Sequence, residues 1–291
     1  MTTSIPVEPG KRTGSLRRTR IMTLVGTYVA LLIVVLIVLF PMYWMVITSL
    51  KLPREIYRVP SLWPETFTRV NYDILINKKE FLVNMKNSFI VASMVTIISL
   101  FISSFAAYSI VRFKYRFKGL VGRVILFAYL TPTSLLFIPL SIIIAKLGLG
   151  NSLNGLIIVY LTFSLPLSTW LLQGYFRGVP RELEEQAMVD GSTRIGALFR
   201  ILLPLSAPGL AAVAIFTFTG AWNELLLALI FITSESKRTV PLGINYLITS
   251  DVLPWGTLMA GAVLSSLPVM LLYFIAQRFM VQGMTSGSVK G

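Results

Sequence analysis

The stretch IMTLVGTYVALLIVVLIVLFPMYWMVITS, residues 21–49, decides the fold class because it contains no charged residue. A helix needs roughly 20 apolar residues to cross the hydrocarbon core of a membrane. Five further stretches are long enough, at about 88–111, 121–146, 153–173, 206–232 and 256–280. Their length and the absence of period-2 alternation argue against strands. We therefore predict an all-α, polytopic membrane bundle of six transmembrane helices.

The first stretch follows the basic segment KRTGSLRRTR (11–20), as the core of a secretory signal would. Its apolar run exceeds the roughly 7–15 residues of a signal h-region, and no A-x-A cleavage site follows. We expect a helix that is retained as a membrane anchor.

The composition excludes several classes of function. The chain is 55% hydrophobic and 13% charged, whereas soluble domains carry about 25% charged residues. It has no Cys and no His, which removes thiolate chemistry and the commonest metal ligand and general base. No G-x-x-x-x-G-K-[ST] motif is present for phosphate binding. We therefore expect a non-catalytic chain without a metal site or a cofactor of its own.

The net charge of +14 is a topology signal rather than a sign of nucleic-acid binding, because the basic residues lie between apolar stretches. With six spans, both termini lie on one side. The short, strongly basic connection RFKYRFKG (112–119) marks that side as cytoplasmic. We predict a basic cytoplasmic segment 1–20, a transmembrane domain 21–291 with a cytoplasmic tail 281–291, and an outer connection 50–87 that contacts partners outside.

The connection at about 174–205 contains ELEEQAMVDG (182–191), which holds four of the 12 acidic residues in the chain. Pro180 and the acids after it favour a helix start, and Asp190-Gly191 predicts its end, with Gly191 at a positive φ if the bend requires it. Ser192 is a candidate cap for a second helix. That helix has an apolar stripe at Ile195, Leu198, Phe199 and Leu202.

We predict a helix–turn–helix on the inner membrane face. The plain alternative is a solvated loop with some amphipathic helix, in which Glu182 and Glu184 are solvated charges.

Residues 185–204 match the signature E-A-A, Gly, I-x-L-P of bacterial importer permeases. The matching positions are Glu185-Gln186-Ala187, Gly191, Ile201, Leu203 and Pro204. The stretch AWNELLLAL (221–229) and the tail QGMTSGSVKG (282–291) also match the sugar branch. From about residue 21 to 291 the chain thus resembles the carbohydrate (maltose-type) ABC importer permeases. Gln186 departs from the signature, which has Ala at this position.

The resemblance implies a subunit of the bacterial plasma (inner) membrane that works with several partners. These are a second homologous permease, two copies of a cytoplasmic ABC ATPase that bind ATP and Mg, and an extracytoplasmic sugar-binding protein. The solute would be a di- or oligosaccharide, and transport would follow alternating access. The loop would dock on the ATPase, with Glu185 in its cleft. The coupling set is Glu182, Glu184, Glu185, Gln186, Ala187, Asp190, Gly191, Ile201 and Pro204.

Polar groups at membrane depth are candidates for contact with the solute. Trp222, Asn223 and Glu224 combine an aromatic face with hydrogen-bonding groups, as sugar recognition needs. Glu224 has an alternative role as a structural strut. An ion-driven carrier centred on Glu224, or an importer of another solute such as glycerol phosphate, also remains open. Breaks at Pro132, Pro139 and Pro166 are candidates for lining a cavity, or are simple kinks.

Overall fold

The computed structural model describes residues 13–58, 60–78, 80–248 and 253–287, and this part of the chain is helical without any strand. Four helices are long and apolar enough to cross a membrane: α1 (Thr13–Ser49), α4 (Phe81–Arg112), α7 (Leu153–Gly178) and α14 (Trp255–Gly287). Two sharply bent helix pairs raise the number of spans to six if each pair is counted as one. The all-α membrane fold is confirmed, while the number six depends on that counting.

The third predicted span bends at Pro132. Helix α5 (Lys118–Leu130) and the segment Thr133–Lys146, which comprises the 3₁₀ turn η2 (Thr133–Leu136) and α6 (Phe137–Lys146), meet at 94°. Pro132 lacks the N–H that would continue the helix, and it disfavours the helical conformation at Thr131, which is extended. Pro139 lies in the first turn of α6, and α7 continues through Pro166 without a break. Of these three prolines, only Pro132 lies at a break in its span.

The prediction of one continuous span at 206–232 is wrong. Helix α11 (Ala207–Asn223) ends before Glu224, which is extended, and α12 (Leu226–Phe231) begins just beyond. The prediction rested on the apolar composition, which continues through residue 232. In the structure, the carboxylate of Glu224 accepts hydrogen bonds from backbone N–H groups in the first turn of α12. A side chain that caps a helix start favours a new helix over continuation of the previous one.

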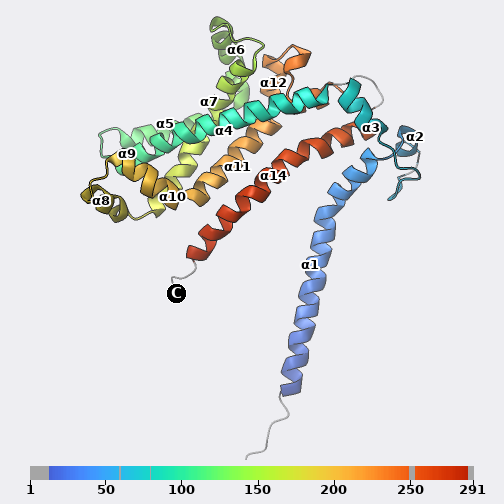
Figure 1. The fold of residues 1–291 in the computed structure, drawn as a ribbon, viewed down its shortest axis with the longest axis horizontal. Helices are drawn as coiled ribbons and strands as arrows, with labels where there is room; N and C mark the ends of the chain where they lie inside the picture. The colour runs from blue at the N-terminus through green and yellow to red at the C-terminus, as the bar shows by residue number, and fades with distance from the viewer. Residues whose placement is uncertain (1–12, 59, 79, 249–252, 288–291) are drawn as a thin grey trace, which may run out of the picture.

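Helix α1 stands away from the rest of the bundle over most of its length (Figure 1). None of the most apolar window within Arg20–Ser49 is buried. Burial begins only at its C-terminal end, at Ile47, Thr48 and Ser49, where α1 meets α14. The exposed apolar surface of α1 is suited to lipid or to another membrane helix.

The centre of the bundle consists of α4, α7 and α11. A buried chain of hydroxyl groups joins them: Ser168 on α7 lies 2.9 Å from Ser99 on α4 and 3.1 Å from Thr217 on α11. Hydrogen bonds between helices stabilise packing inside a membrane, where apolar contact alone gives little preference for a neighbouring helix over lipid.

Short helices gather at the two ends of the bundle (Figure 1). Helices α8 (Arg181–Val189), α9 (Arg194–Ala197) and α10 (Leu203–Leu205) lie at one end, and α2 (Pro53–Ile56) and α3 (Val70–Asp73) lie at the opposite end. The segment Arg194–Leu205 meets α11 at 79°. The acidic α8 and the long connection at residues 50–87 therefore serve opposite ends of the bundle.

Candidate functional site

The predicted end of the acidic helix is confirmed in detail. The Ser192 N–H donates to the Ala187 carbonyl at 2.9 Å, and the Gly191 N–H donates to the Met188 carbonyl at 3.2 Å. Together these two bonds form a Schellman motif, which requires a left-handed residue just past the helix. Gly191 has φ +90°, as the sequence predicted for a bend at this position.

The second helix begins one residue later than predicted. Ser192 belongs to the turn, and the hydroxyl of Thr193 accepts a hydrogen bond from the Gly196 N–H at 3.0 Å. Only half of the predicted stripe is buried. Leu198 and Leu202, in the π-helical turn η3 (Leu198–Leu202), are fully buried in a cluster with residues of α4 and α7, whereas Ile195 and Phe199 are exposed.

Glu184 is the anchor of α8, and the interpretation of this residue as a solvated charge is wrong. Its carboxylate accepts a hydrogen bond from Arg112 Nε at 2.6 Å, and the two side chains are only 4% and 9% exposed. The other end of the guanidinium donates from Nη2 to the Val179 carbonyl at 2.9 Å, and Arg181 donates to the Arg112 carbonyl at 3.1 Å. The last residue of α4 therefore holds α8 in a fixed orientation.

The opposite face of α8 is exposed. Glu185 makes an ion pair with Arg181 at 3.2 Å, with both side chains about half exposed, so this pair is worth about 0–1 kcal/mol. Val189 is 87% exposed among acidic neighbours. This exposed face forms a shallow hollow lined by Glu182, Glu185, Gln186, Val189 and Asp190.

The other members of the predicted coupling set lie apart from this hollow. Ala187 is half-buried within α8, and Gly191 forms the turn. Ile201 is half-buried in η3, and Pro204 is exposed in α10.

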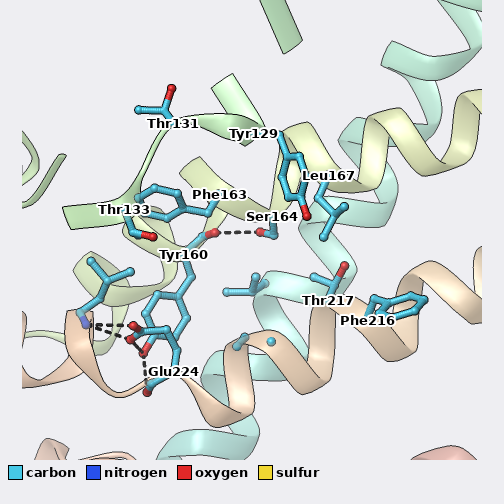
Figure 2. Close-up of a pocket in the computed structure, with 14 residues that line it drawn as sticks. Tyr129, Thr131, Thr133, Tyr160, Phe163, Ser164, Leu167, Phe216, Thr217 and Glu224 are labelled. Atoms are coloured by element: carbon cyan, nitrogen blue, oxygen red, sulfur yellow. Dashed lines mark hydrogen bonds between the residues drawn. The ribbon is translucent and has the colours of Figure 1, made fainter. Parts of the chain in front are cut away.

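A second site lies within the bundle, where the break after α5 faces α7 and α11 (Figure 2). It is a cavity of about 290 Å³. Its lining combines aromatic rings with hydroxyl groups and one carboxylate. The residues labelled in the figure are Tyr129, Thr131, Thr133, Tyr160, Phe163, Ser164, Leu167, Phe216, Thr217 and Glu224.

Glu224 has three hydrogen-bond donors around its carboxylate. The Leu227 N–H donates at 3.0 Å, the Ala228 N–H at 3.2 Å and the Tyr160 hydroxyl at 3.0 Å. This geometry supports the strut interpretation, since Glu224 both caps α12 and ties it to α7. Figure 2 shows Glu224 beside Tyr160, with the hydrogen bonds among the residues that line the cavity.

The predicted triplet at 222–224 does not form one site. Trp222 is buried and stacks on Phe218 with 5.7 Å between ring centroids. Asn223 is exposed and borders a different hollow together with Trp222. Only Glu224 of the three lines the cavity.

The residues of YLTPTS (129–134) that line the cavity were not singled out from the sequence. The signal available was a tyrosine and two threonines placed around Pro132, one of the three prolines considered as breaks or simple kinks. Within the described part of the chain, no three acidic residues lie close enough together to hold a metal ion.

Apolar helices that enclose a cavity lined by hydroxyl groups fit a membrane transport protein. The family model described as "binding-protein-dependent transport system inner membrane component" matches residues 99–286, and the chain belongs to this family. It is therefore a multi-pass inner membrane protein of the ABC permease type.

Several relatives match most of the chain, including two whose names specify a solute. The sulfoquinovosyl glycerol transport system permease protein SmoH of Agrobacterium fabrum is 38% identical over 87% of this chain and 89% of its own length. The trehalose/maltose transport system permease protein MalG of Thermococcus litoralis is 36% identical over 94% of this chain and 97% of its own length. The predicted resemblance to maltose-type permeases is confirmed.

The fold matches a solved transporter as well. A chain of a bacterial ABC transporter involved in the import of the acidic polysaccharide alginate superimposes with a TM-score of 0.73. The match covers 93% of this chain and 99% of that chain at 20% identity, and it supports the fold alone.

Proposed function

We propose that this chain is a permease subunit of an ATP-driven importer of di- or oligosaccharides. It forms the translocation path with a second homologous permease and draws energy from two copies of a cytoplasmic ABC ATPase, which bind ATP and Mg. An extracytoplasmic sugar-binding protein delivers the solute. The names of the relatives support a sugar as solute, and this chain itself contributes no catalytic group.

The observation that carries the proposal is the two-sided geometry of α8. The inward face is fixed by the buried pair of Glu184 with Arg112. The outward face presents Glu185, Gln186 and Val189 in one hollow. A helix whose position is set by the bundle and whose acidic face is free is suited to dock on a basic cleft of the ATPase. Glu185 exchanges its weak pair with Arg181 for a desolvated pair with a basic group there.

Packing connects α8 to the solute path. Helix α8 contacts η3. In η3, Leu198 and Leu202 are buried in the same cluster as Tyr108 of α4, Phe176 of α7 and Val213 of α11. Closure of the ATPase would displace α8 and, through this cluster, the three central helices. The cavity would then open outward and afterwards inward, as alternating access requires. In this proposal the α8 end and both termini are cytoplasmic, and the α2–α3 end faces the binding protein.

The ion-driven alternative is less well supported. It requires an ionisable group at membrane depth that exchanges ions with water during the cycle. The carboxylate of Glu224 instead accepts hydrogen bonds from two backbone N–H groups and the Tyr160 hydroxyl. Releasing them would uncap α12.

The proposal is tested by purifying the chain with its membrane partners and measuring ATP hydrolysis with binding protein and a panel of sugars. We expect one sugar to stimulate hydrolysis in the wild type, and Glu185→Ala to lose that stimulation at an ATPase concentration that saturates the wild-type permease pair. Leu183→Ala is the matched control, because Leu183 is exposed on α8 but does not line the hollow, and it should keep most of the stimulation. Absence of a co-purifying ATPase, together with normal transport by Glu185→Ala, would contradict the proposal.

A further inference from the structure

The charged residues around the cavity indicate which kind of sugar the cavity can hold. No Lys or Arg belongs to the described residues that line it, and its one ionisable carboxyl is Glu224. Three hydrogen-bond donors among the described residues point at this carboxylate, and the lining residues include no basic group that would cancel a negative charge there. An anionic solute entering the cavity would meet negative charge at its floor and no basic residue in the lining.

The remaining lining is neutral and suited to a sugar ring. Tyr129, Phe163 and Phe216 supply flat apolar faces. The hydroxyls of Tyr129 and Thr133 make no hydrogen bond within the described part of the chain, so they are free to bind a solute, while that of Thr217 is shared with Ser168. Small-molecule sites are typically apolar and aromatic, with a few polar groups that fix orientation.

We infer that this cavity is a subsite for an uncharged sugar and that it rejects phosphorylated, sulfonated and uronic acid solutes. The inference rests on the proposed function, since it assumes that the cavity is part of the solute path. It distinguishes this chain from a permease for glycerol phosphate. The same inference separates this chain from the alginate transporter, whose solute is acidic.

Electrostatic selection is measurable by thiol labelling because the chain contains no Cys. Thr133→Cys places a single thiol in the cavity, and Ser134→Cys places one at the exposed neighbouring residue, which does not line it. Both variants are assembled with partner subunits whose own cysteines have been replaced. The probes are a neutral hydroxyethyl and an anionic sulfonatoethyl methanethiosulfonate, applied to the complex with and without ATP.

We expect the ratio of neutral to anionic labelling rates to be about tenfold higher at Thr133→Cys than at Ser134→Cys, because the cavity weakens screening of the carboxylate. Adding Glu224→Gln should remove most of that difference. Trehalose should protect Thr133→Cys, and trehalose 6-phosphate at the same concentration should not.

The outcomes distinguish a failure of the charge inference from a failure of the proposed function. Equal rate ratios at the two positions, or equal protection by the two sugars, would overturn the inference about charge and leave the importer proposal intact. A Thr133→Cys that no reagent labels in any nucleotide state would place the cavity outside the solute path. That result would contradict the path in the proposed function and the inference with it.

Discussion

Two carboxylates that turn into the bundle, Glu184 and Glu224, are held in different ways. Glu184, at the α8 end, faces the full positive charge of Arg112 at 2.6 Å. Glu224 faces only dipoles, those of two backbone N–H groups and a tyrosine hydroxyl. The first arrangement cancels the charge and fixes a helix. The second satisfies the carboxylate but leaves its negative field in the cavity, so one acid serves architecture and the other also shapes the solute path.

The largest effect is expected from breaking the first arrangement. Arg112→Ala would leave the carboxylate of Glu184 buried without its partner, which typically costs about 3–5 kcal/mol. We expect a clear loss of thermal stability of the purified complex, measured by its unfolding midpoint. Replacing the pair by Arg112→Met with Glu184→Leu should recover most of that stability, because both charges are then removed.

Arg181→Ala is the control for that experiment, because it removes the exposed pair with Glu185 and one hydrogen bond to the Arg112 carbonyl. An effect as large as that of Arg112→Ala would show that the buried pair is not what anchors α8.

A smaller effect is expected at the second carboxylate. Glu224→Ala removes the cap of α12 and the partner of the Tyr160 hydroxyl, which together are worth about 1–3 kcal/mol. Tyr160→Phe removes only one of these bonds and should cost about 1 kcal/mol. Thermal unfolding of both variants measures the difference. If Glu224→Ala were as stable as the wild type, the carboxylate would not be what ends α11 and starts α12.

The turn after α8 offers a finer test of how the helix is positioned. Gly191 has φ +90°, a conformation that L-residues disfavour by about 1–2 kcal/mol. Gly191→Ala should therefore lower stability by about 1 kcal/mol, although no atom lies within 4 Å of the added Cβ. Gly174→Ala, on a helical glycine of α7 that is equally open, is the matched control and should be neutral or slightly stabilising.

The sequence predicted the features that depend on local pattern. The apolar stretches indicated the helices, and Asp190-Gly191 indicated the end of α8. The bend falls at one of three candidate prolines, Pro132, whereas the helices continue through Pro139 and Pro166. The features that depend on tertiary contacts escaped prediction. Glu184 and Glu185 are adjacent and identical in type, and only the position of Arg112, 72 residues earlier in the chain, turns one inward. Likewise, no periodicity reveals that Glu224 caps a new helix within an apolar run.

The most direct test of the account compares Glu184→Gln with Glu185→Gln in the assembled complex, measuring thermal stability and affinity of the permease pair for the ATPase. Glu185→Gln should change stability by less than about 0.5 kcal/mol, as expected for an exposed group. It should nevertheless weaken ATPase binding by about 2–5 kcal/mol, as loss of a desolvated charge pair does. Glu184→Gln should lower stability. ATPase binding that Glu185→Gln leaves unchanged, with a loss of binding but not of stability in Glu184→Gln, would contradict the assignment of the two faces.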